Sequence, residues 1–301
     1  MPGNPRVMCG LPRYSCANLA WFSRRLWYFL SVRRWDTFND VYAAIARSVE
    51  PKVDVDAVTF ARTRLGFEPD EKQEEVLASD AKRGILNCSR QWGKSTVTAA
   101  KAIHRAYTRP GALVLVASPS ERQSAEFLRK ASELVRRLGV KPRGDGDNAI
   151  SLALPNGSRI VGLPGREATV RGFSAVSMIL IDEASRVPDE LYRALRPMLA
   201  VGDGDLWMMS TPCGQRGFFY QTWTGALGNG EEWMKVCVQA TDCPRISASF
   251  LDRERGTMTA AEFAQEYMGE FHGDGTEYFD RQLIEEAIDL SIPELNIPGR
   301  R

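Results

Sequence analysis

The sequence predicts an α/β fold in which a mainly parallel sheet is covered by helices on both faces. Three observations support this. Short apolar runs of strand length alternate with stretches of helical spacing along most of the chain. One run leads into a loop containing Gly-Lys-Ser and then an Ala-rich helix. Another run ends directly in two acids, and its unbroken apolar character is typical of a parallel strand buried on both faces.

In chain order, residues 36–66 are expected to form a small helical lead-in. The segment 149–163 is expected to form a hairpin, because Asn156-Gly157 between apolar alternations is a strong turn signal. The remaining strands are predicted at 84–88, 112–118, 178–181, 206–209 and 233–240, and the remaining helices at 96–105, 121–138 and 187–199.

The loop after the first strand is predicted to bind the phosphates of a nucleoside triphosphate. Gly93 permits a tight turn, Lys94 supplies a cation for the β and γ oxygens, and Ser95 supplies a hydroxyl for Mg²⁺. The dipole of the following helix adds partial positive charge. The pattern departs from the usual motif at Cys88, where glycine is common, and the alternative is a plain surface turn. The predicted nucleotide-binding residues of the loop are Ser89, Arg90, Gln91, Trp92, Gly93, Lys94, Ser95 and Thr96.

The acids that end the strand at 178–181 are the predicted catalytic pair. In parallel sheets, ligands bind beyond the carboxyl ends of the strands. Asp182 is expected to hold Mg²⁺, directly or through water, and Glu183 to orient and polarise the attacking water. The alternative is a helix whose first turn carries acids because the helix dipole favours them.

Two arginines are candidates for stabilising charge on the γ-phosphate. Arg90 lies inside the phosphate loop, and Arg171 lies in a Gly/Arg-rich loop before the acidic strand, where it could serve its own or a neighbour's nucleotide. The alternative for each is a solvated loop residue or a structural ion pair.

Two further signals accompany these motifs. Ser210, Thr211 and Pro212 end the next apolar strand, where a hydroxyl could sense the γ-phosphate or hydrogen-bond to Glu183 and so couple hydrolysis to movement. Gln73, upstream of the loop, carries an amide that could read the edge of adenine. Alone, the first is an ordinary turn and the second a solvated glutamine.

Together these residues resemble the ATPase domain of the large terminase subunit of tailed bacteriophages. The resemblance covers residues 60–285 and depends on the deviant loop with Arg90, on Asp182-Glu183, on Ser210-Thr211-Pro212 and on Gln73 in combination.

The resemblance implies a phosphate-loop NTPase of the additive-strand type. It implies an ATP-hydrolysing, Mg²⁺-dependent motor that moves viral double-stranded DNA into a procapsid. The same resemblance makes Arg90 or Arg171 the arginine finger, and the strand end at Ser210 the coupling motif. The implied partners are double-stranded DNA, the portal protein, the small terminase subunit and further copies of the chain in a ring.

The expected organisation is a basic helical lead-in at 1–59, the ATPase core at 60–245 and a helical segment at 246–301. That last segment would lead toward a nuclease domain, and no nuclease activity is expected from this chain because its late acids lie in helical or Gly-interrupted surroundings. The expected location is the cytoplasm of the infected bacterial host, with transient docking at the portal.

Two other functions stay open. A helicase-like nucleic-acid-dependent ATPase would share the loop and the acids, although no room remains for a second motor domain after residue 240. A non-catalytic assembly subunit could retain the nucleotide site as a relic, although intact Lys94, Ser95, Asp182 and Glu183 argue against it.

Composition narrows the class of protein only weakly. The 301 residues carry 39 basic and 38 acidic side chains, so the net charge of +1 gives no overall DNA-binding signature. Residues 1–35 contain six arginines and no acid, which suits DNA contact, a partner-binding helix or a start site placed too early. Arg24 and Arg25 interrupt the apolar stretch there, so no membrane span is expected. Six cysteines without a CxxC pair favour a reducing compartment without structural zinc.

Overall fold

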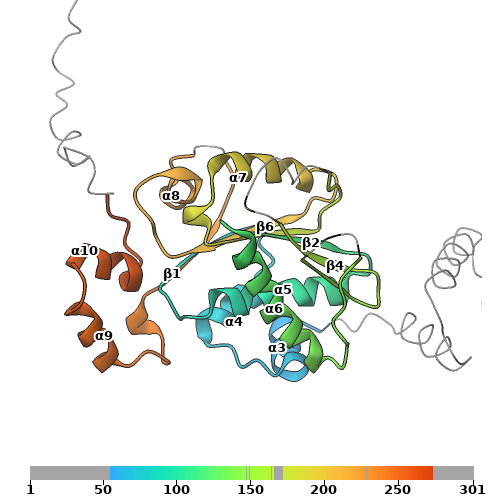
Figure 1. Ribbon diagram of the computed structural model, residues 1–301, viewed down its shortest axis with the longest axis horizontal. Helices are drawn as coiled ribbons and strands as arrows, with labels where there is room; N and C mark the ends of the chain where they lie inside the picture. Colours follow the sequence, from blue (N-terminus) through green and yellow to red (C-terminus); the bar gives the residue numbers. More distant parts are fainter. Residues whose placement is uncertain are drawn as a thin grey trace, which may run out of the picture. The chain divides into compact units, whose positions relative to one another are not determined.

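The computed structural model divides the chain into two units, Met1–Pro51 and Lys52–Arg301, and Figure 1 labels helices and strands of the second unit. The structure describes residues 55–146, 148, 150–163, 165, 172–227 and 230–273, all within the second unit. The basic N-terminal stretch, the Arg171 loop and the acids after residue 273 lie outside the described residues.

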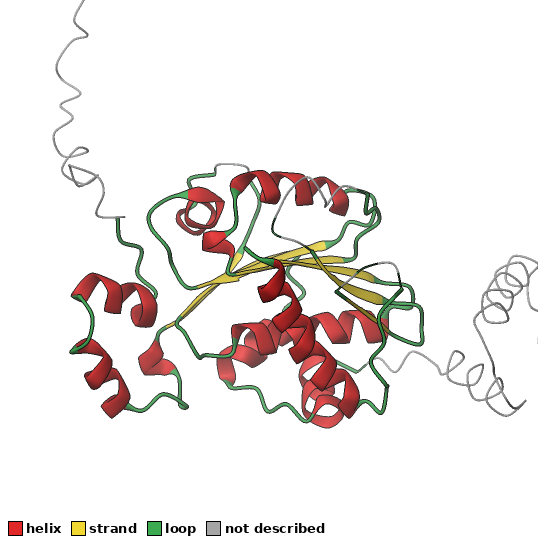
Figure 2. Cartoon of the chain, in the orientation of Figure 1, coloured by secondary structure: helices red, strands yellow, loops and turns green. Residues whose placement is uncertain are grey.

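A seven-stranded sheet forms the centre of the described part of the chain (Figure 2). Its strand order is β3-β4-β2-β5-β6-β1-β7, and every pairing is parallel except the antiparallel pair β3-β4. The strand β6 therefore lies between β1 and β5, as the additive-strand type requires. The strands are β1 Arg83–Cys88, β2 Leu113–Ala117, β3 Ser151–Ala153, β4 Arg159–Gly162, β5 Met178–Asp182, β6 Asp205–Ser210 and β7 Met234–Val238.

Helices cover both faces of this sheet (Figure 1). One face carries α3 Ala57–Leu65, α4 Glu71–Ala78, α5 Lys94–Thr108 and α6 Glu121–Arg137. The other carries α7 Asp189–Leu195, the short turn η3 Arg196–Leu199 and α8 Gly217–Thr224. The last described elements are the turn η4 Ala240–Asp242, α9 Ala248–Arg255, α10 Ala260–Phe263 and the single π-turn η5 Ala264–Met268. No helix among the described residues is long and apolar enough to cross a membrane.

Strand periodicity builds the two cores. In β5, Met178 and Leu180 join the apolar cluster under α3–α6, whereas Ile179 and Ile181 join the cluster under α7 and α8. Successive side chains of a strand point to opposite faces, so a run that is apolar at every position fills both layers. The expectation of a parallel sheet covered on both sides is confirmed.

The predicted strands and long helices agree with the structure where it describes them, whereas residues 36–54 of the predicted helical lead-in lie outside the described residues. The predicted hairpin is present as β3 and β4, and the long helices keep their predicted positions. The segment predicted to be helical at 187–199 forms the α-helix α7, which ends at Leu195, and then the 3-10 turn η3. Pro197 lies in that turn, and a proline lacks the N–H that an α-helix needs and disfavours helical geometry in the residue before it.

The predicted domain limits stay predictions. The limit between residues 59 and 60 falls inside α3, whose Phe60, Ala61 and Leu65 are buried in the main core. Residues after 245 contribute a small apolar cluster of their own that includes Leu251, Phe263 and Tyr267.

One close contact in the sheet explains a glycine in a central strand. Gly84 of β1 is paired with Trp207 of β6, and the indole of Trp207 is fully buried across the glycine. A Cβ atom at position 84 would lie 2.3 Å from the indole ring. The ammonium group of Lys101 in α5 lies over this ring, at 4.5 Å from its centroid, and donates to the Val76 carbonyl near the end of α4 at 2.9 Å.

We expect Gly84→Ala to lower the free energy of unfolding by about 1–3 kcal/mol, because the added methyl must displace a packed indole. Gly144→Ala is the matched control, since a Cβ at that exposed glycine would meet its nearest neighbouring atom at an ordinary 3.5 Å and the substitution should cost less than about 0.5 kcal/mol. Urea unfolding curves measure both. Equal midpoints for the two variants would show that Trp207 does not restrict position 84.

Candidate nucleotide-binding site

Three neighbouring parallel strands bring the predicted site residues to one edge of the sheet. Asp182, at the end of β5, pairs with Met209 of β6, and Ser210 of β6 pairs with Asn87 of β1. The phosphate loop follows β1, Glu183 follows β5, and Thr211 follows β6. The sequence separations are large, but the shared strand direction places all three segments side by side.

The phosphate loop has the backbone conformation of a tight turn before a helix. Gly93 has a φ of 101° and caps α5, which begins at Lys94, and Gln91 has a φ of 64°. A non-glycine residue in this region is uncommon and costs conformational energy, which indicates a constrained functional loop. The side chain of Cys88, at the position where glycine is usual, lies in the main core and so leaves the loop uncrowded.

Lys94 is buried with its ammonium group turned back over the loop. Its Nζ donates to the carbonyl oxygens of Cys88 and Ser89, at 3.1 Å each. A buried ammonium requires such acceptors. The same loop leaves the Ser89 hydroxyl buried without a hydrogen-bond partner among the described residues. The loop therefore holds a lysine ammonium where the motif predicts phosphate.

The two predicted Mg²⁺ ligands lie in contact. The Ser95 hydroxyl donates to Asp182 Oδ2 at 3.2 Å. Burial, with a smaller effect of neighbouring Glu183, raises the pKa of Asp182 to about 6, although Lys94 and Ser95 oppose this shift. A buried carboxylate beside a hydroxyl offers the hard oxygen ligands that Mg²⁺ prefers, and its raised pKa is the cost of holding that charge without a bound cation. These residues fit the ion.

Glu183 occupies a turn that is strained for its residue type. Its φ of 51° is in the left-handed region, and its N–H donates to Asp182 Oδ1 at 3.1 Å. It caps a 3-10 turn, η2 Ala184–Arg186, and its carboxylate forms an ion pair with Arg186 at 3.2 Å. Strain at this position, directly after the metal-ligand candidate, is consistent with a functional carboxylate.

The end of β6 is joined to the acidic turn by side chains of that turn. Ser185 Oγ lies 2.7 Å from Ser210 Oγ and donates to the Thr211 carbonyl at 2.8 Å. Arg186 donates to Thr211 Oγ1 at 3.2 Å. Thr211 thus reaches Glu183 through Arg186 rather than by a direct hydrogen bond, and Pro212 is buried behind it.

Of the two candidate arginine fingers, the structure describes only Arg90. Arg90 has a half-exposed side chain, at 59%, and its guanidinium is paired with the carboxylate of Glu266 in η5. Its backbone N–H also donates to the Glu266 carbonyl at 3.2 Å. Arg171 lies outside the described residues. Which of the two acts as the finger stays a prediction.

Gln73 is hydrogen-bonded to the backbone of Trp92, which is part of the phosphate loop. The Gln73 amide donates to the Trp92 carbonyl at 3.0 Å and accepts from the Asp70 N–H at 3.0 Å. The Trp92 indole packs in the main core, so only the backbone of Trp92 is available to phosphate. One Gln73 amide proton stays outside these two bonds, and adenine reading stays a prediction.

Sequence reasoning missed three side chains that meet this edge. Arg186 contacts Glu183 and Thr211, Glu266 contacts Arg90 and Arg186, and Arg245 donates to the Trp92 carbonyl at 2.5 Å. Arg186 had a signal, since a residue three positions after the catalytic candidate returns to the same side of a turn. Arg245 is the last residue of the predicted core and Glu266 lies 21 positions beyond it, and neither belongs to a local motif.

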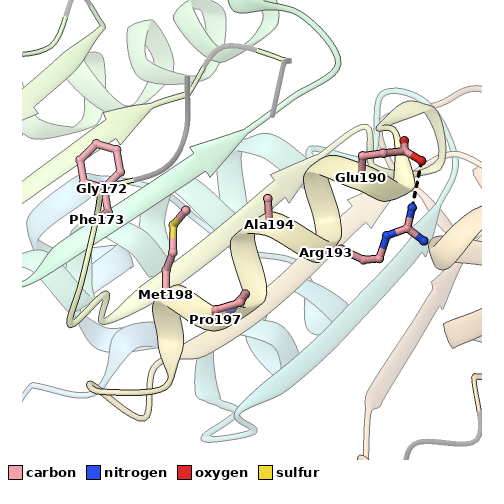
Figure 3. A pocket seen from close by; sticks show the side chains of 7 residues that line it. All are labelled: Gly172, Phe173, Glu190, Arg193, Ala194, Pro197 and Met198. Atoms are coloured by element: carbon pink, nitrogen blue, oxygen red, sulfur yellow. Dashed lines mark hydrogen bonds and ion pairs between the residues drawn. The ribbon is translucent and has the colours of Figure 1, made fainter. Parts of the chain in front are cut away.

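A separate pocket of about 550 Å³ lies between Gly172-Phe173 and the side of α7 and η3 (Figure 3). Its lining is largely apolar and includes Met198 and Pro197, and Glu190 and Arg193, which also line it, form an ion pair farther along the helical segment. None of the predicted phosphate or metal residues lines it. The candidate nucleotide site is therefore the strand edge and not this pocket.

The fold and the strand edge together define a phosphate-loop NTPase fold with an added central strand. A family model described as "Terminase large subunit, T4likevirus-type, N-terminal" matches residues 85–286, which is more than half of the chain. The chain belongs to this family of terminase large subunits.

Two curated proteins with similar sequences are also terminase large subunits. The large terminase subunit of Thermus virus P23-45 is 29% identical over 239 residues, covering 69% of this chain and 49% of the relative. The large terminase subunit of Thermus phage G20c is 28% identical with the same coverage. The chain therefore spans about half the length of the curated relatives it matches.

Solved structures show the same fold. The ATPase domain of the Thermus phage P74-26 large terminase superposes with a TM-score of 0.62 at 23% identity, covering 71% of this chain and 97% of that domain. The large terminase of a thermophilic bacteriophage, solved in complex with ADP, gives a TM-score of 0.59 at 15% identity, covering 67% of this chain and 54% of the other. The predicted family and fold class are confirmed.

Without bound metal, we expect Asp182→Asn to raise the free energy of unfolding at pH 7.5 by roughly 1–3 kcal/mol, because the folded wild type then holds a buried charge. A folded pKa of about 6 against 3.8 means that the wild-type destabilisation is complete above pH 6 and diminishes as pH falls toward 4. Urea unfolding in EDTA at pH 7.5 and pH 4.5 tests this. The exposed Asp252→Asn is the control, and a stability gap independent of pH would contradict a buried charge at Asp182.

Proposed function

We propose that the chain is the ATPase part of a DNA-packaging motor, which hydrolyses ATP with Mg²⁺ to move viral double-stranded DNA into a procapsid. One observation carries the proposal. In a chain of the terminase large-subunit family, the phosphate loop, the acidic pair and the hydroxyl-bearing strand end meet at one edge of the sheet. Each group has the chemistry that a step of ATP hydrolysis requires.

Binding would involve the loop and its lysine. The N–H groups of the loop and the Lys94 ammonium would hold the β- and γ-phosphates, and Lys94 would exchange its present carbonyl acceptors for phosphate oxygens. Ser95 and Asp182 would hold Mg²⁺. When bound, Mg²⁺ neutralises charge that develops on the phosphate oxygens. Gln73 would read adenine with its remaining amide proton.

Hydrolysis would involve Glu183. Its carboxylate follows the metal ligand directly and is 29% exposed, so it is accessible to a water molecule that it would orient and polarise. Arg90 or Arg171 would stabilise charge on the γ-phosphate, and for Arg90 this requires leaving Glu266. A movement of the acidic turn would be transmitted to the segment after β6 by the contacts of Ser185 and Arg186 with the end of that strand. The residues at this strand end are Ser210, Thr211 and Pro212.

The partners are proposed from family membership. They are double-stranded DNA, the portal protein, the small terminase subunit and further copies of this chain in a ring, in the cytoplasm of the infected host. Two related observations support nucleotide binding: the large terminase of the thermophilic bacteriophage was solved with ADP and also with ATP-gamma-S. The similarity of those structures to this chain is a similarity of fold.

We expect the purified protein to release phosphate from ATP with Mg²⁺, and Lys94→Ala to abolish both binding and turnover. Glu183→Gln should still bind ATP, because the amide keeps the shape, but should lower turnover by about 100-fold or more because it cannot accept a proton. Phosphate release measures turnover, and a fluorescent ATP analogue measures binding.

Lys141→Ala and Glu133→Gln, both exposed and distant in sequence from the loop and the acids, are the matched controls. Wild-type turnover in both Lys94→Ala and Glu183→Gln would contradict the assignment. Loss of ATP binding in Glu183→Gln would show that Glu183 is needed to maintain the binding site and would contradict a purely catalytic role.

A further inference from the structure

We propose that Arg186 is a positioning residue for Glu183, holding its carboxylate at the strand edge through a guanidinium shared with Thr211 and Glu266. The proposal deepens the ATPase function above and rests on it. Within the described part of the chain, the hydrogen bonds of Arg186 go to the acidic turn and the end of β6 and not to the phosphate loop. Arg186 therefore contacts Glu183 directly, whereas among the described residues it reaches the phosphate loop only through Glu266, which also pairs with Arg90.

The local backbone brings Arg186 beside Glu183. Residues 184–186 form a 3-10 turn, and the Arg186 N–H donates to the Glu183 carbonyl at 2.9 Å. With three residues per turn, side chains three positions apart lie on the same side. The left-handed conformation of Glu183 starts this turn, so its backbone strain also serves to place Arg186.

The guanidinium joins three segments. Arg186 NH1 donates to Glu183 Oε2 and to Thr211 Oγ1, at 3.2 Å each. Its NH2 forms an ion pair with Glu266 Oε1 at 3.6 Å. A planar group with several donors is suited to such a junction, whereas a lysine ammonium is a compact point charge on a flexible stem. In this position the Arg186 guanidinium contacts the acidic turn, the end of β6 and η5 at the same time.

Glu266 is a fixed anchor for this junction. Its side chain is 19% exposed, and its backbone carbonyl accepts from the Arg90 N–H at 3.2 Å. Three residues further on, the Gly269 carbonyl accepts from the Asn87 side chain of β1 at 2.7 Å. Both ends of this short segment are thus tied to β1 and its loop, and the carboxylate of Glu266 is held at a defined distance from them.

An ordinary surface ion pair is the competing explanation, and the chain contains one for comparison. Arg193 and Glu190 in α7 also lie three residues apart, at 2.9 Å, but their side chains are 66% and 62% exposed. Arg186 and Glu183 are about half as exposed, at 32% and 29%, and Arg186 has two further partners. Exposed ion pairs such as Arg193–Glu190 contribute little to the free energy of unfolding. A partly buried guanidinium with several partners restricts the side chains that it contacts to one arrangement.

Orientation of the carboxylate matters for catalysis because a small displacement of a general base costs much of the rate. Glu183 has rotatable side-chain bonds and is partly exposed, so its backbone alone does not fix the carboxylate. The Arg186 contact supplies the missing restraint. We expect Arg186→Gln to lower kcat for ATP hydrolysis by about tenfold, the loss that accompanies removal of one charged hydrogen bond, with KM changed less than about twofold.

Steady-state phosphate release from the full chain tests this, with Arg193→Gln as the control that removes a matched pair and should change neither constant. Arg186→Lys should recover only part of kcat, since the ammonium cannot reach all three partners. Equal kcat values for Arg186→Gln and Arg193→Gln would overturn the proposal, and so would a rise in KM with kcat unchanged.

Hydrogen exchange provides a readout that does not depend on activity. In Arg186→Gln without nucleotide, amide exchange of residues 183–187 and of the Thr211 segment should become faster by about threefold or more, and in Arg193→Gln it should not. Unchanged amide exchange rates in both segments of Arg186→Gln would overturn the proposal that Arg186 holds the acidic turn and the end of β6 together. A wild-type protein without ATPase activity would refute the proposed function, while the exchange result would still decide whether Arg186 holds the turn.

Discussion

The site depends on the parallel pairing of β5, β6 and β1 in that order. The pairing gives the three strands one direction, so their carboxyl ends share an edge, and the register sets Asp182 beside Met209 and Ser210 beside Asn87. Each strand alternates between two buried apolar layers, so a slip by one residue would exchange the two cores. The hydrophobic pattern therefore fixes the positions of the chemical groups as well as the fold.

The edge concentrates features that cost stability. Gln91 and Glu183 adopt left-handed backbone conformations, Asp182 holds a charge in a buried place, and the Ser89 hydroxyl has no partner among the residues that the structure describes. A bound cation would compensate the buried charge of Asp182. The cores beside the edge supply the compensating stability, with Trp207 packed directly over Gly84 and Lys101 over the indole. Stability is thus lowest where ligands are expected to bind.

Sequence reasoning predicted what short patterns encode. The strands were visible as apolar runs, the hairpin as Asn156-Gly157, and the phosphate loop and acids as local motifs. The added strand between β1 and β5 came only from the resemblance, because strand order depends on packing between distant segments. The segment 187–199 was predicted to be helical between its prolines, and Pro197 lies where α7 gives way to the 3-10 turn η3.

Side-chain partners were the least predictable part. Arg90 is paired with Glu266, 176 positions away, and the indole of Trp92, a residue predicted to bind nucleotide, packs in the main core. Thr211 communicates with Glu183 through Arg186, which a reading of either motif alone does not show. Apart from the spacing of three positions between Glu183 and Arg186, these contacts depend on how separate elements pack, and no local pattern predicts them.

A crystal structure of the protein with ADP and Mn²⁺ tests the central claim most directly. Mn²⁺ can be located by its anomalous scattering. We expect the metal beside the Ser95 hydroxyl and Asp182, with the diphosphate over the loop from Ser89 to Ser95. Nucleotide bound elsewhere, such as in the pocket between Phe173 and Met198, or metal without contact to either residue, would contradict the assignment of this edge as the nucleotide site.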